Sequence, residues 1–591
     1  MATVQPDRQA LSPAPPREPS REPWRRRVLR TLLYGRNVDR AAKARARIGL
    51  AILVFAMGYS VIAGRLVMFA LNPEAHTARR VAAQDAVATA RPDIVDRNGQ
   101  ILATDIRAPS LFAEPHRIID VDEASELLTA VIPEIDAAEL RERLSSKRRF
   151  VWLKREITPK QREQIYRLGL PGIGFLPENK RIYPNGAEVS HVLGYVNIDN
   201  QGAAGLEKWL DARGLADLHL AGLASDRLQE PVELALDLRV QHALRDELIA
   251  GREKFKAIAA AGVVSDVRTG EVVAMVSLPD YDPNNPREEA LDRTRVNRLT
   301  AGTYEMGSTF KALTLAMALD SGKITLKSSF DASHPLQYDK FTIHDFHAQN
   351  RVLTVPEIFT YSSNIGTARM ALSLGIEHHK WFLRKMGQLD LLRTELPERK
   401  EPMVPKRWVE LNTVTIAFGH GIAVAPLQAV AAIGALMNGG RLIPPTFLKR
   451  SEQDALKLST QVVKPDTSDK MRYLMRLNVE KGSATRADVK GYYVGGKTGT
   501  SEKVVAGRYS KTKVLTSFTA VFPADQPRYL LLVMLDEPQA TPETHGFTTS
   551  GWNAVPVGGS IVGRIAPMLG VEPRFELPTS DKLILASATG R

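Results

Sequence analysis

A serine and a lysine three residues apart open the stretch "YEMGSTFKALTLAMALDSG", residues 304–322. Nearly every position from Ala312 to Leu319 is apolar or small, which predicts a helix that is buried on all sides. Lysine is almost never fully buried without a partner or a task. At helical spacing Ser308 lies on the same face as Lys311. Such a pair suits nucleophilic catalysis, with a hydroxyl that attacks and an amine that accepts its proton.

Two further motifs follow in the order that this chemistry requires. Ser362-Ser363-Asn364 stands 51 residues after Lys311, and Lys497-Thr498-Gly499-Thr500 stands 133 residues after Asn364. Taken alone, the first is common as a turn or helix cap, and the second as a turn at the end of a strand. The ordered trio S-x-x-K, S-x-N and K-T-G is far more specific than any of its parts.

A second S-x-x-K match occurs at Ser510-Lys511-Thr512-Lys513. It lies in "VVAGRYSKTK", a polar, basic stretch that predicts a loop in which both lysines remain solvated. Ser308 differs because it follows Gly307 and opens a buried helix, whose N-terminus adds positive potential at the hydroxyl. Without the other motifs, Ser308 would read equally well as a helix cap beside a lysine that reaches solvent.

The composition limits the remaining chemistry. The 591-residue chain has 44% hydrophobic residues, enough for several globular domains. It has no cysteine, which excludes disulfides, zinc–thiolate sites and a catalytic thiol. His344 and His347 are spaced as half a metal site, but no third ligand follows at a convincing spacing. We therefore expect no metal and no cofactor, and place both imidazoles at the rim of the site.

The positive charge is concentrated at the N-terminus. Residues 1–47 hold twelve Lys and Arg against four Asp and Glu, so most of the net charge of +13 lies there. This distribution argues against nucleic acid as a partner.

An apolar segment follows directly. Residues 48–64 carry no charge, and after Arg65 the apolar run continues to Leu71. The charge-free part alone spans about 25 Å as a helix, so the whole segment is long enough to cross a bilayer. A cleaved signal peptide is the less favoured alternative, because the preceding tail is long and no A-x-A site follows. We expect an uncleaved anchor with its basic side in the cytoplasm and the bulk of the chain outside the inner membrane.

The rest of the chain divides into two patterns. Residues 90–225 are mixed, with a "DRNG" hairpin turn followed by two short helical segments, which indicates a spacer domain. Beyond a strand-to-helix boundary near residue 230, residues 259–279 form an alternating strand pair, and residues 514–536 form another. Long helical stretches lie between these pairs. This order predicts an antiparallel sheet that is closed by both ends of the domain and packed against helices.

The three motifs and four longer segments resemble class B penicillin-binding proteins of the FtsI type, the septal peptidoglycan transpeptidases. The longer segments are "RPDIVDRNGQILA", "RIYPNGAEVSHVLGYVNIDNQGAAGLE", "SDVRTGEVVAMVSLPDYDPNNP" and "GHGIAVAPLQAVAA". The resemblance covers nearly the whole chain from the anchor onward. Met306 and Ala312 stand where the family commonly has proline, which alters the entry to the helix and no reactive group.

The resemblance implies an α+β fold with a single N-terminal transmembrane helix, a mixed α/β pedestal domain of the dimerisation type, and a serine β-lactamase-like transpeptidase domain. The last has a five-stranded antiparallel sheet flanked by helices. The expected divisions are a largely disordered cytoplasmic tail at 1–47, a transmembrane anchor at 48–71, the pedestal at 72–230, the transpeptidase domain at 231–575 and a C-terminal tail at 576–591.

The resemblance also implies the roles of the site residues. Ser308 attacks the D-Ala-D-Ala bond of a stem peptide, Lys311 takes its proton, and Ser362 relays a proton to the departing D-Ala. Asn364 hydrogen-bonds the substrate and Lys311, while Lys497 adds positive potential. The substrate-binding residues of the K-T-G segment also include Thr498, Gly499 and Thr500. The threonine hydroxyls are expected to bind the terminal carboxylate. The backbone N–H groups of Ser308 and Thr500 are expected to form the oxyanion hole.

Four other functions remain open beside the septal transpeptidase. An elongation-specific transpeptidase is the nearest, and a β-lactamase is disfavoured because the chain has a pedestal and an anchor and lacks a deacylating Glu motif. A bifunctional glycosyltransferase would need more than the residues between anchor and transpeptidase domain, and a β-lactam sensor would need a larger cytoplasmic domain. The expected partners are stem peptides, β-lactams, the inner membrane, an FtsW-like lipid II polymerase and other division proteins.

Overall fold

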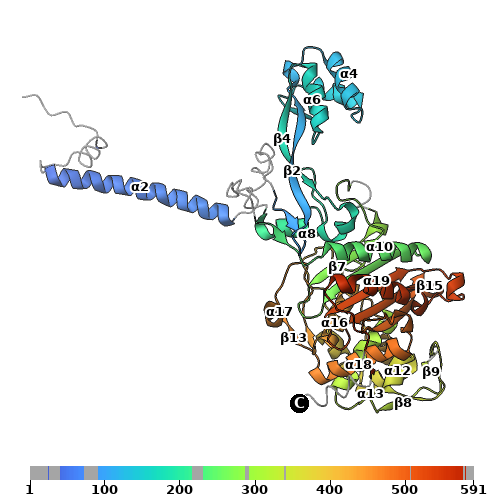
Figure 1. Ribbon diagram of the computed structural model, residues 1–591. Helices are drawn as coiled ribbons and strands as arrows, with labels where there is room; N and C mark the ends of the chain where they lie inside the picture. Colours follow the sequence, from blue (N-terminus) through green and yellow to red (C-terminus); the bar gives the residue numbers. More distant parts are fainter. Residues whose placement is uncertain are drawn as a thin grey trace, which may run out of the picture. The chain divides into compact units, whose positions relative to one another are not determined.

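The computed structural model describes residues 24, 40–71, 91–215, 230–286, 292–338, 341–505, 507–576 and 579–580. Its contacts divide the chain into two compact units, Met1–Ala86 and Val87–Arg591, which are described separately (Figure 1). The predicted disorder of residues 1–23 and most of the predicted C-terminal tail lie outside the described residues.

The first unit contains the long helix α2, Arg40–Leu71. Within it, Arg47–Arg65 is the one segment of the described chain that is long and apolar enough to cross a membrane, by length and composition. Its side chains are exposed rather than packed against protein. The helix therefore lacks the buried partner surface that a soluble core helix of this composition would have.

The second unit begins with a sheet of five strands in the order β3-β2-β1-β5, with β4 on the other side of β2. β1 (Ile94–Val95) and β2 (Ile101–Ala113) form the predicted hairpin across the "DRNG" turn. β2 then pairs antiparallel with β4 (Ile173–Ile182) along its length. The other two strands of this sheet are β3 (Val151–Lys154) and β5 (Val232–Glu233).

A small helical head lies at the far end of the β2–β4 ribbon (Figure 1). It contains the two predicted helices, α4 (Val121–Val131) and α5 (Ala137–Leu144), and a third, α6 (Pro159–Leu168). Asp120 and Asp136 cap the N-termini of α4 and α5, because each side chain accepts hydrogen bonds from backbone N–H groups in the first turn of its helix. The three helices share an apolar cluster with the adjoining ends of β2, β3 and β4, which buries their inner faces.

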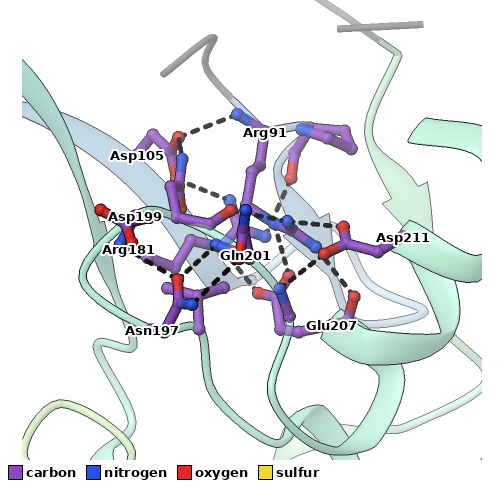
Figure 2. A network of polar contacts seen from close by, with 12 residues as sticks. Arg91, Asp105, Arg181, Asn197, Asp199, Gln201, Glu207 and Asp211 are labelled. Carbon is purple, nitrogen blue, oxygen red and sulfur yellow. Dashed lines mark hydrogen bonds and ion pairs between the residues drawn. The ribbon is translucent and has the colours of Figure 1, made fainter. Parts of the chain in front are cut away.

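A buried ionic network ties together the opposite end of this sheet (Figure 2). Arg91 contacts Glu207 at 2.9 Å and Asp211 at 2.7 Å. Arg181 contacts Glu207 at 2.7 Å and Asp105 at 3.1 Å. Each buried cation thus has two carboxylate partners, which is the arrangement that offsets the cost of removing charges from water.

The core of the larger domain is a five-stranded antiparallel sheet in the order β14-β15-β16-β6-β7. The predicted strand pairs are confirmed, and the two chain ends of the domain meet where β16 pairs with β6. The strands are β6 (Ala259–Asp266), β7 (Val272–Leu278), β14 (Gly495–Val505), β15 (Arg508–Phe522) and β16 (Tyr529–Asp536).

Helices cover both faces of this sheet. α10 (Leu238–Lys254) and α19 (Ala554–Met568) lie side by side on one face (Figure 1). α11 (Lys311–Asp320), α16 (Pro426–Met437) and α18 (Pro465–Lys481) belong to the core cluster of the other face. Because side chains alternate along a strand, β16 contributes to both clusters, which explains why it is apolar from Tyr529 to Leu535.

Of the remaining elements, α7 (Ser190–Leu193) and α8 (Gly205–Leu210) belong to the segment that includes the first sheet, and the others belong to the larger domain. The other helices are α12 (Val355–Thr360), α13 (Asn364–Leu374), α14 (Ile376–Lys385), α15 (Glu410–Ala417) and α17 (Glu452–Leu458). The short strands are β8 (Ser329–Asp331), β9 (Leu336–Tyr338), β10 (Phe341–Ile343), β11 (Val352–Thr354), β12 (Arg441–Leu442) and β13 (Thr460–Gln461).

Candidate active site

Ser308 stands at the start of the buried helix. A single 3₁₀ turn, η7 (Gly307–Phe310), runs directly into α11. Ser308 is partly exposed, whereas the other three residues of the turn are buried. The hydroxyl at the head of this helix is therefore within reach of a ligand from solvent.

Two glycines allow the Ser308 turn to be held between neighbouring backbones. Gly307 has a φ of +52°, and a Cβ there would lie 2.6 Å from the carbonyl oxygen of Thr500 in β14. On the other side, a Cβ on Gly419 would lie 2.0 Å from the carbonyl oxygen of Gly307. Only glycine permits either approach. The nucleophile candidate is thus fixed by backbone packing between β14 and the turn at residues 419–421.

Lys311 is completely buried. Its Nζ donates hydrogen bonds to the backbone carbonyl of Ser362 and, at 3.1 Å, to the Ser362 hydroxyl. Among the described side chains no hydrogen bond joins Ser308 to Lys311. The amine therefore lies on the Ser362 side of the site, where it can connect the nucleophile's helix to the S-x-N motif.

Ser362 links the two lysines of the site. It lies between α12 and α13 with a φ of +56°, a left-handed conformation that typically costs a non-glycine residue about 1–3 kcal/mol. Its hydroxyl oxygen accepts hydrogen bonds from Lys311 at 3.1 Å and from Lys497 at 3.0 Å. A strained residue that receives two buried amines is typical of a functional site rather than of a structural turn.

Burial determines the charge of these amines. Lys497 is also fully buried, with its Nζ 5.5 Å from the ring centroid of Phe359, and desolvation lowers its pKa to about 7. Desolvation lowers the pKa of Lys311 well below the ordinary lysine value, and the charge of Lys497 lowers it further. Asp345 acts weakly in the opposite direction. Burial and the charge of Lys497 both favour the neutral form of Lys311, which is the form that a proton acceptor needs.

Asn364 is the first residue of α13. Its amide nitrogen donates to the carbonyl of His344 at 2.9 Å. The expected hydrogen bond from Asn364 to Lys311 is not formed among the described residues, because the hydrogen bonds of the amine go to Ser362. This placement leaves the amide oxygen of Asn364 as the group for a substrate.

The K-T-G segment occupies β14, the edge strand of the sheet beside the Ser308 turn. The hydroxyl of Thr498 is 2.7 Å from that of Ser483, and the hydroxyl of Thr500 accepts from the backbone N–H of Ser550 at 3.2 Å. Alternation along the strand places both threonines on one face. A Cβ on Gly499 would lie 2.7 Å from the backbone carbonyl oxygen of Met306, so this position requires glycine.

Asp345 is a site residue that the sequence analysis missed. Its carboxylate accepts from the Ser363 hydroxyl at 2.6 Å and from the backbone N–H of Ile365 at 2.9 Å. These contacts hold the chain immediately after Ser362. The only available signal was its position between the two histidines of "FTIHDFH", which says nothing about a contact 18 residues away.

His420 was also missed. It lies in the 419–421 turn, where it stacks on Tyr509 with ring centroids 5.7 Å apart. Burial, with a smaller effect from Lys311, lowers its pKa to about 4. A neutral aromatic ring therefore stands near the base candidate, and the glycines on both sides of it were the signal for a tight turn.

The prediction that Ser510 lies in a loop is wrong. Ser510 lies within β15, in a hairpin where it pairs with Lys503. Backbone pairing alone supports this extension, so the polar side chains do not prevent a strand. Lys511 and Lys513 are exposed, in contrast to Lys311.

His344 and His347 are exposed at the edge of this region. The part of the chain that the structure describes contains no group of three or more His, Asp or Glu side chains arranged to hold a metal. The His344 carbonyl, rather than its imidazole, makes the contact with Asn364.

Comparison with known proteins covers both parts of the second unit. Residues 260–551 match the penicillin-binding protein transpeptidase domain, and residues 86–213 match the penicillin-binding protein dimerisation domain. A probable peptidoglycan D,D-transpeptidase FtsI of Caulobacter vibrioides is 39% identical over 499 residues, which is 83% of each chain.

Two further proteins are similar to this chain over most of its length. The peptidoglycan D,D-transpeptidase FtsI of Escherichia coli K12 is 30% identical over 84% of this chain and 86% of its own. A crystal structure of a peptidoglycan synthetase from Bifidobacterium adolescentis superposes with a TM-score of 0.65 at 23% identity, over 84% of this chain and 98% of that one. At that identity the likeness concerns the fold alone.

Proposed function

Since the chain belongs to the penicillin-binding protein transpeptidases that carry a dimerisation domain, we propose that it is a peptidoglycan D,D-transpeptidase of the septal cell wall. It cross-links stem peptides through an acyl-enzyme on Ser308. The observation that carries this proposal is the pair of buried amines, Lys311 and Lys497, that converge on the Ser362 hydroxyl at the head of the Ser308 helix.

In the acylation step, the Ser308 oxygen attacks the carbonyl carbon of the penultimate D-Ala. Neutral Lys311 accepts the serine proton, and Ser362 passes a proton to the nitrogen of the terminal D-Ala as its amide bond breaks. The contact between Lys311 and Ser362 supports this route. The products are an ester on Ser308 and a free D-Ala.

In the transfer step, the amine of a second stem peptide attacks the ester carbonyl. Its excess proton returns along the same groups to the Ser308 oxygen as the ester bond breaks. The result is a new amide between two peptides and a regenerated serine. No water is consumed, which distinguishes transfer from the hydrolysis that a β-lactamase performs.

The K-T-G strand orients the donor peptide. Thr498 and Thr500 bind its terminal carboxylate, with positive potential from Lys497, and Asn364 holds the peptide backbone. The backbone N–H groups of Ser308 and Thr500 stabilise the oxyanion. The close packing of Gly307 against the Thr500 backbone supports this pairing of N–H groups.

β-Lactams use the same step. Their strained amide presents a carbonyl to Ser308 and a carboxylate to the threonines, but the leaving nitrogen stays attached to the bound fragment. The acyl-enzyme therefore keeps its leaving group in place and blocks the acceptor peptide.

We place the chain in the inner membrane, with residues 1–47 in the cytoplasm, a single span at 48–71 and the bulk of the chain in the periplasm. The basic tail and the apolar segment of α2 support this orientation. The pedestal then occupies 72–230, the transpeptidase domain 231–575 and a tail 576–591. The family matches at 86–213 and 260–551 fall inside the two domain ranges.

The proposed partners are a lipid II polymerase of the FtsW kind and other division proteins. Depletion of the protein distinguishes this role from an elongation role, because loss of septal cross-linking lengthens cells into filaments, whereas loss of side-wall cross-linking rounds them. Rounded cells would assign the chain to elongation without changing the acyl-transfer chemistry.

A labelled penicillin tests the proposed reaction. The full-length, membrane-embedded protein should be labelled on Ser308, and Ser308→Ala should abolish labelling. Ser510→Ala is the matched control, because it removes the serine of the other S-x-x-K match and should leave labelling unchanged. Label recovered on Ser510 or Ser362 by peptide mapping would contradict the assignment.

Because the chain has no cysteine, single introduced cysteines can test its orientation. In intact spheroplasts, an impermeant maleimide should react with Tyr166→Cys, at an exposed position of the pedestal head. It should react with Ala2→Cys only after the membrane is permeabilised. Reaction of Ala2→Cys in intact spheroplasts would reverse the orientation.

A further inference from the structure

Glu305 lies three residues before Ser308 and has no part in the reaction described above. Its Oε1 accepts a hydrogen bond from the backbone N–H of Gly421 at 2.9 Å and another from the Tyr509 hydroxyl at 2.9 Å. Its backbone carbonyl accepts from the Ser501 hydroxyl at 2.7 Å. One residue thus contacts the 419–421 turn, β14 and β15, which surround the nucleophile.

The other carboxylate oxygen of Glu305 is buried and has no hydrogen-bond partner among the described residues. Burial raises the pKa of this carboxyl group, although the bonds from Gly421 and Tyr509 oppose that effect. A half-satisfied buried carboxylate is a costly choice for a position that merely needs to pack. Packing alone therefore does not explain this residue, whereas the hydrogen bonds accepted by its other oxygen give it a role beside the site.

Tyr509 lies on a part of the β14–β15 hairpin that the main sheet does not support. The pairing of β15 with β16 ends at Leu515 and Asp536. Beyond a register shift after Glu502, β14 and β15 pair only with each other. An isolated two-stranded hairpin is marginally stable, so its position depends on contacts such as those of Tyr509.

Tyr509 makes two contacts that hold this outer hairpin against the site. Its hydroxyl donates to Glu305, and its ring stacks on His420. His420 lies in the same turn as Gly419, the glycine packed against Gly307. The 419–421 turn and the outer β14–β15 hairpin, which form this side of the site, therefore both contact the Glu305 carboxylate.

We propose that Glu305 is a positioning residue for acyl transfer: its carboxylate fixes the 419–421 turn and the outer β14–β15 hairpin against the turn that carries Ser308. The inference rests on the proposed acyl-enzyme at Ser308 and extends it to the residue that sets the geometry there. Displacements of about 1 Å at a reacting group can cost about 100-fold in rate. Loss of this acceptor should therefore slow acylation without removing any reacting group.

The carboxylate acts as an acceptor rather than as an acid or base. Its bonded oxygen already receives two donors, both from the protein. Glutamine keeps a carbonyl oxygen in the same place, so Glu305→Gln should retain both hydrogen bonds. Alanine removes the acceptor, so Glu305→Ala should release the turn and the hairpin together.

The test measures the acylation rate constant with a fluorescent penicillin, at saturating penicillin and per titrated site, on the full-length protein. We expect Glu305→Ala to lower it by about 10- to 100-fold and Glu305→Gln to stay within about threefold of wild type. Tyr509→Phe should lower it by a smaller factor. Ser510→Ala, one residue further along the same hairpin, is the matched control and should have no effect.

A double variant separates positioning from general destabilisation. Because Glu305→Ala already removes the partner of the Tyr509 hydroxyl, adding Tyr509→Phe should cause no further loss in the acylation rate constant. Unfolded protein does not titrate, so a loss of folding alone would leave the rate constant per site unchanged. If Glu305→Ala does not fold, the ordering of Glu305→Gln, Tyr509→Phe and Ser510→Ala still tests the proposal.

Three results would overturn the inference. These are a Glu305→Ala rate constant within threefold of wild type, a Glu305→Gln variant as slow as Glu305→Ala, and fully additive losses in the double variant. In the case where Glu305→Ala yields no folded protein, a Tyr509→Phe rate constant equal to that of Ser510→Ala would do the same. Failure of the underlying function looks different, because the wild-type protein itself would then carry no label on Ser308.

Discussion

The chain buries two arginines in the pedestal and two lysines in the transpeptidase domain. The arginines have carboxylate partners, whereas the lysines share a hydroxyl. In the pedestal, Arg181 lies between Glu207 and Asp105. Burial alone would lower its pKa, but these carboxylates hold it above the ordinary arginine value. In the transpeptidase domain, Lys311 and Lys497 share one neutral hydroxyl, and burial lowers both of their pKa values.

The difference teaches how to separate a structural charge from a reactive one. A buried cation with carboxylate partners keeps its proton and joins distant segments of the chain, as the ionic network does at the root of the pedestal (Figure 2). A buried amine without a direct carboxylate partner has its pKa lowered instead, which favours its neutral form. Residues of the first kind should control stability, and residues of the second kind should control catalysis.

The largest expected effect comes from replacing the amine at the reactive site. Lys311→Met removes the proposed proton acceptor, so the acylation rate constant should fall by about 1000-fold or more. Its melting temperature should not fall, because a buried amine that must lose its proton on folding opposes folding below the ordinary lysine pKa.

The direction of the Lys311 pKa shift determines how the contribution of this residue to stability changes with pH. The pKa of Lys311 is lower in the native than in the unfolded state, so the native state binds fewer protons and this group's contribution to stability improves as pH rises toward the ordinary lysine value. Calorimetry on wild type and Lys311→Met checks both points. Lys457→Met, at an exposed lysine, is the control, and a drop of several degrees for Lys311→Met alone would contradict the comparison.

Glu207→Ala should produce the next largest effect, and it should be on stability. It leaves two buried guanidinium groups short of a partner, which typically costs about 3–5 kcal/mol in the free energy of unfolding. The acylation rate constant per titrated site should stay unchanged. Glu114→Ala, which breaks a mostly exposed ion pair with Arg117 in the same domain, should cost less than about 1 kcal/mol.

Chemical denaturation followed by fluorescence, with site titration in parallel, measures both quantities. Equal destabilisation by Glu207→Ala and Glu114→Ala would mean that burial of the network contributes nothing. A lower rate constant per site in Glu207→Ala would show that the network also acts on the chemistry.

Asp345→Ala should have a smaller effect on the acylation rate constant, because Asp345 holds the chain next to Ser362 and is not itself a reacting group. It removes two hydrogen bonds that hold the chain after Ser362, so we expect the acylation rate constant to fall by about tenfold. Since Asp345 raises the pKa of Lys311, the rising limb of the pH–rate profile should also move to lower pH. His347→Ala, at an exposed position nearby, should change neither, and a shift to higher pH in Asp345→Ala would contradict the assigned electrostatics.

Much of the fold was predictable because it depends on local patterns. The strand pairs at 259–279 and 514–536 alternate or run apolar as buried strands do, and they meet as β6, β7, β15 and β16. The ordered motifs likewise brought Lys311, Ser362 and Lys497 together. Regular periodicity and motif order carry this information without any knowledge of the chain's path.

Contacts that depend on that path were not predictable. Arg91 meets Glu207 across 116 residues, and Glu305 meets Tyr509 across 204. Asp345 reaches Ser363 only because its loop folds back onto α13. No spacing rule links such partners, since each contact is set by the packing of separate elements. The hairpin around Ser510 was missed for a related reason, because its backbone pairing leaves no hydrophobic period in the sequence.

The pH dependence of acylation tests the central claim that Lys311 is neutral because it is buried beside a second lysine. The acylation rate constant should rise with pH through an apparent pKa that belongs to the coupled site and lies well below 10.4, the ordinary lysine value. In Lys497→Met, which removes the like charge, the remaining profile should move to higher pH, whatever the rate lost through weaker substrate binding. A wild-type rate that still climbs through pH 9 to 10, or a profile unmoved by Lys497→Met, would contradict the account.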